Sequence, residues 1–507
     1  MNIRQAKEYI KDSVKIYLKK DAYGEYRVPL VRQRPIFLLG APGIGKTAIM
    51  EQIAQELGIA LVSYSMTHHT RQSALGLPFI RHKEYTDLET DVSEYTMSEI
   101  IASVYDVMEE SGVREGILFL DEINCVSETL APSMLQFLQY KVFGRHRVPD
   151  GWAIVTAGNP PEYNKSVREF DVVTMDRVRV LEVEADYETW KGYARQMGVH
   201  NAILNFLDLK KEYFYRIETT VKGRSYVTAR GWEDLSEILY LYEEEQLPVD
   251  ETLIGQYLRN ERIVKEFAAY YDLYQKYKRD YKVDEILAGN FGEDTVQKAA
   301  EAAFDERLSL LGMLLDRMQG EIRDVMETTA VLSELVPMLK GVRAVLEKNP
   351  DAGAGQLAEL LEKQILGRQK LMDSMKKANA LSERDKKKHM ALLRFLEDAQ
   401  KICVLQDTEN GKEAFGMIKK RFDARTAAVK EMTLQTKQHL SGLFGFVEKA
   451  FASGNEMLLL MTELTVNENS SRFIATFGCT EYQQHNEELL LSQRQMEISE
   501  QIRQLEL

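Results

Sequence analysis

The chain has 507 residues, of which 44% are hydrophobic and 28% are charged, and its formal net charge is −14. This composition excludes a chain that is disordered throughout, and the acidic balance argues against a general nucleic-acid-binding surface, which requires a basic face. The cysteines Cys125, Cys403 and Cys479 are too few and too scattered for a disulfide framework, which favours a reducing compartment. Neither a membrane span nor the apolar segment of a signal peptide is recognisable, so we expect a cytoplasmic protein.

Five short runs of β-forming residues lie before about residue 185, and helical patterns alternate with them. The runs cover residues 36–39, 60–64, 116–120, 153–157 and 178–183. Strands separated by helices are typical of an α/β domain with a mostly parallel sheet.

The chain after these runs is expected to be helical. Residues 187–283 have a helical, aromatic-rich spacing, and beyond about residue 285 apolar residues recur every three or four positions. The only prolines after residue 248 are Pro337 and Pro350. Long helices with charged outer faces predict an all-α bundle or a coiled-coil arm.

A complete phosphate-binding pattern, GAPGIGKT, follows the first predicted strand and opens a predicted helix. Its glycines allow backbone N–H groups to surround phosphates, and the N-terminus of the helix adds positive potential. In such a loop Lys46 reaches the β- and γ-phosphates and Thr47 binds Mg²⁺, so we expect ATP and Mg²⁺ as cofactors. The residues expected to contact the nucleotide are Gly40, Ala41, Pro42, Gly43, Ile44, Gly45, Lys46, Thr47 and Ala48.

Two further predicted strands end in polar residues. Residues 116–120 lead to Asp121, expected to bind Mg²⁺ with Thr47, and to Glu122, expected to polarise the attacking water. Residues 153–157 lead to Asn159, whose amide is suited to bind the γ-phosphate and to orient that water. An Asn-Pro pair is also an ordinary start of a turn, so this third pattern alone leaves both interpretations open.

In order and spacing, these three patterns resemble those of an AAA+ ATPase, and further residues resemble the MoxR family. Arg177, which follows Asp176, resembles the family's arginine finger, and Arg230 lies in a segment that resembles the helix bearing a second sensor arginine. The resemblance covers about residues 3–285. It implies a P-loop α/β core with a helical lid, catalytic roles for both arginines, and a ring, with a hexamer expected.

An arginine supplied by a neighbouring subunit can accelerate phosphoryl transfer by about 10³–10⁵, so hydrolysis would depend on assembly. Other assignments stay open. The family's Asp-Arg-Phe reads Asp-Arg-Val here, so Arg168 and Arg179 are alternatives for the finger. Both proposed arginines also have nearby acids with which they could pair structurally: Asp171 and Asp176 for Arg177, and Glu233 and Asp234 for Arg230.

Two insertions accompany the motifs. Residues 67–80 carry the adjacent His68 and His69, which point apart on any regular element and so are expected to form hydrogen bonds or touch substrate rather than hold a metal. Residues 139–151 predict a hairpin that turns at Gly144. This hairpin is the most basic patch near the motifs, and it is interpreted either as a solvated surface or as a nucleic-acid contact.

We expect three domains. Residues 1–185 form an AAA+ α/β nucleotide-binding domain, 186–285 an α-helical AAA+ lid, and 286–507 an all-α extension that binds a partner or regulates. The MoxR resemblance implies ATP hydrolysis coupled to the remodelling, activation or assembly of a protein partner, typically one with a von Willebrand factor A domain; nucleic acid is not expected. The alternatives are a nucleic-acid-linked AAA+ motor of restriction type and a nucleotide-gated scaffold with little turnover.

Overall fold

The structure is a computed structural model, and it describes residues 1–487 except 69–73, 75, 86–87, 164–166, 169, 221–222, 350–352, 406–409 and 453. The described chain forms two compact units. The first comprises Met1–Thr189, Thr228–Arg230 and Lys363–Leu393, and the rest of the described chain forms the second. No helix among the described residues is both long and apolar enough to cross a bilayer.

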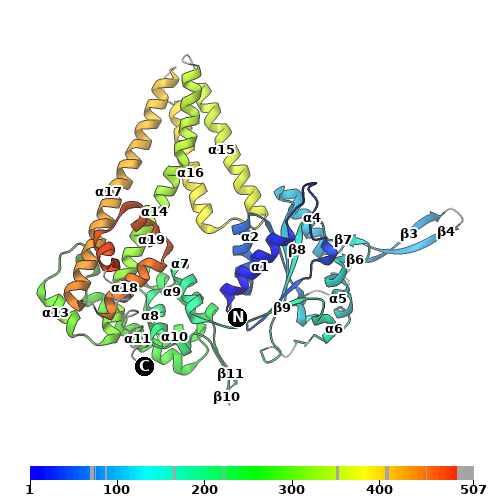
Figure 1. Ribbon diagram of the computed structural model, residues 1–507, viewed down its shortest axis with the longest axis horizontal. Helices are drawn as coiled ribbons and strands as arrows, with labels where there is room; N and C mark the ends of the chain where they lie inside the picture. The colour runs from blue at the N-terminus through cyan, green and yellow to red at the C-terminus, as the bar shows by residue number, and fades with distance from the viewer. Residues whose placement is uncertain are drawn as a thin grey trace, which may run out of the picture. The chain divides into compact units, whose positions relative to one another are not determined.

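A five-stranded parallel sheet forms the centre of the first unit (Figure 1). In spatial order its strands are β2 (Ala60–Ser65), β5 (Gly116–Asp121), β8 (Trp152–Gly158), β1 (Ile36–Gly40) and β9 (Arg179–Val183). All neighbouring pairs are parallel, so the carboxyl ends of β1, β5 and β8 lie together, at the edge where such sheets bind ligands. The five strands predicted from the sequence, and the α/β core that they imply, are confirmed.

Helices cover this sheet and bury its apolar side chains. They are α1 (Ile3–Tyr17), α2 (Lys46–Leu57), α4 (Glu99–Ser111), α5 (Ala131–Tyr140) and the short α6 (Val172–Met175). One core cluster joins Val62, Leu118 and Ile154 of the sheet to Ile100 of α4 and Phe137 of α5. Close packing of this kind fixes the ends of the central strands, where the polar residues of the predicted site lie.

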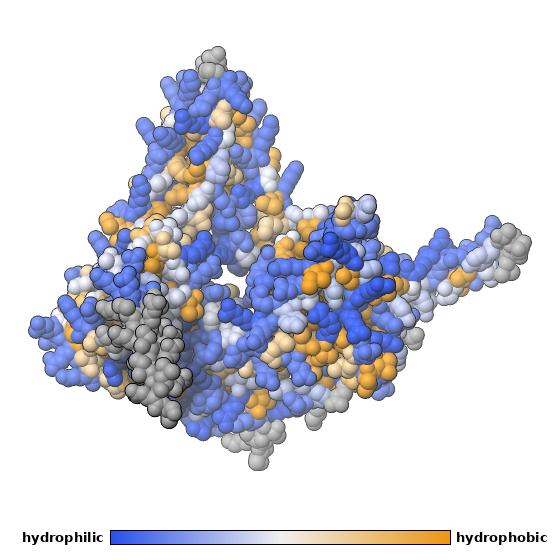
Figure 2. All heavy atoms as spheres, in the orientation of Figure 1, coloured by the Kyte–Doolittle hydropathy of each residue, from blue (hydrophilic) through white to orange (hydrophobic). Residues whose placement is uncertain are grey.

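Two antiparallel hairpins leave the first unit. The hairpin predicted at residues 139–151 is confirmed as β6 (Val142–Phe143) and β7 (His146–Arg147), and Gly144 in its turn has a φ of +58°. The longer hairpin, β3 (Pro78–Tyr85) with β4 (Leu88–Tyr95), was not expected; it extends from the body of the unit and is largely hydrophilic in the view of Figure 2. His69 and its neighbours up to residue 73 lie outside the described residues.

The first elements of the second unit are helices interrupted by one hairpin. The helices are α7 (Tyr187–Met197), α8 (Asn201–Leu209), α9 (Ala229–Glu244), α10 (Glu251–Tyr257) and α11 (Glu261–Asp280), of which α7 and α9 begin within the first unit. The expectation of helices throughout residues 187–283 is wrong at β10 (Arg216–Thr220) and β11 (Gly223–Val227), which pair as an antiparallel hairpin. Threonine, isoleucine, tyrosine and valine in these strands favour extended backbone.

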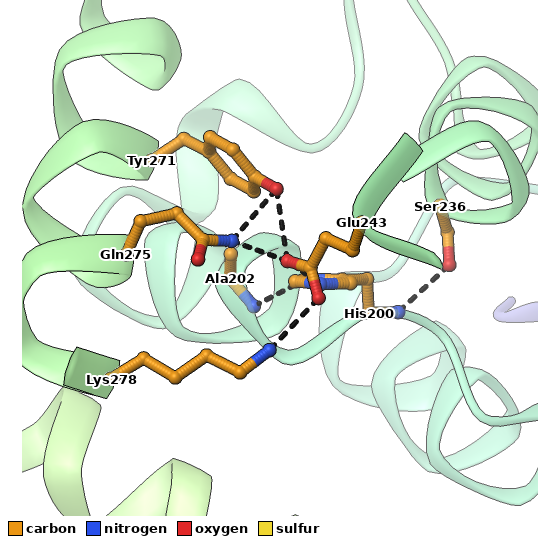
Figure 3. A network of polar contacts seen from close by, with 7 residues as sticks. All are labelled: His200, Ala202, Ser236, Glu243, Tyr271, Gln275 and Lys278. Carbon is orange, nitrogen blue, oxygen red and sulfur yellow. Dashed lines mark hydrogen bonds and ion pairs between the residues drawn. The ribbon is translucent and has the colours of Figure 1, made fainter. Parts of the chain in front are cut away.

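A polar network around Glu243 ties α8, α9 and α11 together (Figure 3). The carboxylate of Glu243 accepts hydrogen bonds from Tyr271 Oη at 2.9 Å, from Lys278 Nζ at 2.9 Å and from Gln275. His200 Nδ1 accepts from a backbone N–H at 3.1 Å, so its proton lies on Nε2, 3.1 Å from the same carboxylate. Burial raises the pKa of Glu243, but the donors around it outweigh burial and hold that pKa far below its ordinary value.

Beyond residue 283 the assigned elements of the described chain are all helices, as expected. They are α12 (Val283–Leu287), α13 (Glu293–Glu301), α14 (Phe304–Lys348), α15 (Ala354–Lys377), α16 (Glu383–Leu405), α17 (Gly411–Phe451), α18 (Asn455–Val466) and α19 (Glu468–Phe477). α14 and α17 share an apolar core with α18 and α19, which includes Leu314, Phe444, Leu460 and Phe473. Through this core, residues 310–326 of α14 and 440–451 of α17 are packed into the second unit.

The turn between α15 and α16 packs into the first unit, on the outer edge of β2. Ala378 and Ala380 are 1% and 4% exposed and belong to the core cluster of the sheet. Leu61 N–H of β2 donates to Ala378 O at 2.9 Å, and Asn379 Nδ2 donates to Leu61 O at 3.2 Å. The turn therefore satisfies backbone groups that an edge strand otherwise leaves open.

Candidate nucleotide-binding site

The loop between β1 and α2 has the backbone shape that its glycines permit. Gly43 and Gly45 have φ angles of +75° and +93°, which other residues adopt only with strain. Gly45 is the N-cap of α2, and no side chain caps this end of the helix. The N–H groups of its first turn, which have no partners within a helix, are thus suited to bind an anion.

Lys46 is the charged residue of the GAPGIGKT pattern, and it is buried, with 8% of its surface exposed. Its Nζ donates to Gly40 O at 2.6 Å, to Ala41 O at 3.0 Å and to Asn159 Oδ1 at 2.7 Å. Burial lowers the pKa of Lys46 to about 8, although the charges of Asp121 and Glu122 act in the opposite direction. The ammonium group thus joins the ends of β1 and β8.

Thr47 and Asp121 are brought together at the adjacent strand end. Thr47 Oγ1 donates to Asp121 Oδ2 at 3.2 Å, and Asp121 Oδ1 accepts from Glu122 N at 2.9 Å. Hydroxyl and carboxylate oxygens are the ligands that Mg²⁺ prefers, and it usually binds through one or two protein groups together with substrate phosphates. The pair therefore fits Mg²⁺ delivered with a nucleotide, and no preformed cluster of three metal-binding side chains occurs in the described chain.

Glu122 directly follows β5 in a left-handed conformation, with a φ of +55°. A non-glycine residue in this region costs about 1–2 kcal/mol, and such strain is typical of functional sites. Its Oε2 accepts a hydrogen bond from Ser65 Oγ at 3.1 Å. Sequence patterns did not reveal Ser65, although it is the polar residue that ends β2 and pairs in register with Asp121 on β5.

Residues 36–159 match the family model of the "ATPase family associated with various cellular activities (AAA)". The match identifies an AAA+ ATPase domain. The comparison with curated proteins gives no match. An AAA domain binds nucleotide, so ATP-dependent activity follows from this match together with the phosphate-binding loop.

The arginines proposed for the AAA domain differ in their surroundings. Arg168 pairs with Glu128 at 2.8 Å, and Arg179 Nη1 donates to Ser13 Oγ at 3.1 Å. Arg177, between α6 and β9, is half-buried and forms no side-chain hydrogen bond or ion pair with another described residue. Its charge nevertheless helps to lower the pKa of Asp171, after the hydrogen bonds that this carboxylate accepts from Thr174, so among the described residues Arg177 interacts only electrostatically with this acid.

Arg230 is exposed in the first turn of α9. It lies in the short segment Thr228–Arg230, which belongs to the first unit. Its charge contributes to the lowered pKa of Lys46. The same segment contacts the phosphate loop, because a Cβ added to Gly43 would lie 3.1 Å from Thr228 Cβ. Arg230 thus acts electrostatically on the lysine of the loop, and it forms no ion pair within the described residues.

The basic hairpin β6–β7 of the first unit presents less positive charge at its surface than its sequence suggests. Lys141 is only 1% exposed, and Arg145 pairs with Glu94 of β4 at 2.7 Å. Neutralised and buried cations do not attract phosphates, so these two residues do not form the basic face that nucleic-acid binding requires.

Proposed function

We propose that the chain is a Mg²⁺-dependent ATPase of MoxR type that forms a ring, with a hexamer expected. It couples hydrolysis to the remodelling, activation or assembly of a protein partner, for which a protein with a von Willebrand factor A domain is the first candidate. The observation that carries the ATPase proposal is the convergence of Lys46, Thr47, Asp121 and Asn159 at the ends of three neighbouring strands.

The roles proposed for the residues follow from their positions. Lys46 would exchange its carbonyl partners for the β- and γ-phosphates, while Thr47 and Asp121 would hold the Mg²⁺ that neutralises them. Glu122, fixed by Ser65, would accept a proton from the attacking water, and Asn159 would orient the γ-phosphate. Arg177 would act on a neighbouring subunit's nucleotide, which makes turnover dependent on the ring.

The two alternative functions differ from this proposal in measurable ways. A nucleic-acid motor needs a basic surface, and the burial of Lys141 and the pairing of Arg145 argue against one at the predicted hairpin. Steeply salt-dependent binding of DNA would favour the motor instead. A nucleotide-gated scaffold would bind Mg·ATP but hydrolyse little of it.

The first test is Glu122→Gln. We expect the variant to bind Mg·ATP as the unmodified protein does, and its turnover to fall about 100-fold or more because the general base is gone. Glu110→Gln is the matched control, since Glu110 is an exposed glutamate of α4 in the same unit. Unchanged turnover in Glu122→Gln would contradict the assignment of Glu122 as the general base. If the unmodified protein binds Mg·ATP but does not hydrolyse it, the nucleotide-gated scaffold would be favoured. The nucleotide-bound Glu122→Gln protein is also the bait with which to isolate the partner.

A further inference from the structure

Asn124 occupies a position between the ends of two catalytic strands. It lies in the 3-10 turn Ile123–Cys125, two residues after Glu122, and is 3% exposed. Its Nδ2 donates to Asn159 O at 2.8 Å, and its own backbone oxygen accepts from Arg168 N at 2.9 Å. One buried side chain thus links the turn that holds Glu122 to the residue that follows β8.

The side-chain amide of Asn124 fits at this position because the neighbouring residue of β8, Gly158, has no side chain. A Cβ added to Gly158 would lie 2.4 Å from Asn124 Oδ1, which no side chain could accommodate without displacing the amide. The same Oδ1 is buried and has no hydrogen-bond partner in the described chain, an arrangement that costs stability. A buried amide kept at this cost, in a space that a glycine provides, has a role other than filling the core.

Asn159 is thereby held through both its backbone and its side chain. Its backbone carbonyl accepts from Asn124, and its side-chain oxygen accepts from Lys46 Nζ at 2.7 Å. If Lys46 moved to a phosphate, the hydrogen bond from Asn124 would remain and would still link Asn159 to the turn that carries Glu122. We infer that Asn124 is a positioning residue for ATP hydrolysis, an inference that rests on the proposed function.

The test is Asn124→Asp in the full chain. Aspartate has almost the same shape, but its carboxylate cannot donate to Asn159 O. We expect kcat to fall about 10- to 100-fold because the γ-phosphate group and the water are misaligned. The Kd for Mg·ATP should change by less than about threefold, because the phosphate loop itself is intact.

A matched control separates positioning from packing. Asn205 of α8 is also buried, at 5% exposed, and also faces a glycine, since a Cβ on Gly312 would lie 2.4 Å from its Nδ2. It belongs to the second unit, so Asn205→Asp should lower the unfolding temperature without lowering kcat. Gly158→Ala, which displaces the amide of Asn124, should reproduce the loss of kcat.

The possible results separate the inference from the function on which it rests. Absence of turnover in the unmodified protein would contradict the proposed ATPase. An active parent with unchanged kcat in folded Asn124→Asp would overturn the positioning role. So would parallel losses of kcat and of nucleotide affinity, because they would indicate damage to the whole site.

Discussion

Lys141 has a buried ammonium group whose positive charge is hardly offset by neighbouring groups. It is the C-cap of α5, directly before β6; it is 1% exposed, and its Nζ donates to Leu138 O. Burial lowers the pKa of Lys141 to about 7. Because the unfolded chain keeps an ordinary lysine pKa near 10.4, folding disfavours the protonated form.

This burial predicts a pH dependence of stability. Between about pH 7 and 10.4 the unfolded state binds more protons than the folded state, so stability rises with pH. Below pH 7 the penalty is fully present, on the order of 5 kcal/mol at most. Lys141→Met keeps the length without the charge and should therefore raise the unfolding temperature at pH 7, with the gain shrinking towards pH 10. The measurement is thermal unfolding across this range, with the exposed Lys19→Met as control. Parallel pH profiles for Lys141→Met and the parent would refute the assignment.

At the residue scale, local motifs could be predicted and long-range partners could not. Lys46, Thr47 and Asp121 were identifiable because their chemistry requires a fixed spacing from a glycine or a strand end. The structure brings these residues together with Asn159, as the strand order requires. Ser65 and Asn124 carry no such spacing, since their significance depends on which strands are neighbours and on a glycine on another strand.

The carboxylate of Glu94 helps to join two hairpins of the first unit, alongside the contact of His146 Nε2 on β7 with Tyr95 O on β4 at 3.2 Å. Glu94 of β4 is 7% exposed and lies 2.5 Å from Lys83 Nζ, 2.7 Å from Arg145 Nη1 and 3.6 Å from Arg81 Nη1. The close ammonium group of Lys83, followed by the charge of Arg145 and then that of Arg81, lowers the pKa of Glu94. Because Arg145 belongs to the turn between β6 and β7, the ion pair ties β3–β4 to the shorter hairpin.

Glu94→Gln should therefore loosen the shorter hairpin. Neutral glutamine cannot hold Arg145 electrostatically, so we expect faster hydrogen exchange at the amides of β6 and β7 in the variant. Glu84→Gln, at an exposed position of β3, is the control and should leave that exchange unchanged. Equal protection of β6 and β7 in both variants would show that the ion pair does not couple the hairpins.

Among the elements, the central strands were predictable and the β3–β4 and β10–β11 hairpins were not. Strands buried on both faces are continuous apolar runs, as β5 and β8 illustrate, and this signal is local. β3 and β4 are solvated and rich in charged residues, so their sequence lacks both an apolar run and a clean alternation. The hairpin at 139–151 was recognisable because Gly144 marks its turn.

At the scale of the whole molecule, the first unit is completed by a segment from far along the chain. Ala378 and Ala380 fill its core, and Ala378 and Asn379 pair with the backbone of Leu61. Asn379 adopts a left-handed conformation with a φ of +53°, which asparagine tolerates better than most residues. The sequence indicated helices here, but no local pattern shows which surface their turn contacts.

Asn379→Leu should destabilise the first unit selectively. It removes the hydrogen bond to Leu61 O and places a poorly suited residue at positive φ, for an expected loss of about 1–2 kcal/mol. Asn379→Gly removes the same hydrogen bond but suits the backbone, so it should cost less. Trp152 reports on the first unit when Trp190 and Trp232 of the second are replaced by phenylalanine, and its fluorescence during denaturation measures the loss. Equal stability of the leucine and glycine variants would contradict the strain argument.

The partner of Leu61 in this turn is 318 positions further along the chain. A ribosome that adds about 5–20 residues per second needs roughly 15–60 s to make the intervening polypeptide. Throughout that interval the backbone N–H and C=O of Leu61, on the outer edge of β2, lack these partners. An open strand edge of this kind is prone to pair with other chains. We therefore expect slower translation to lower, and a chaperone that covers this strand edge to raise, the fraction of the protein that folds correctly.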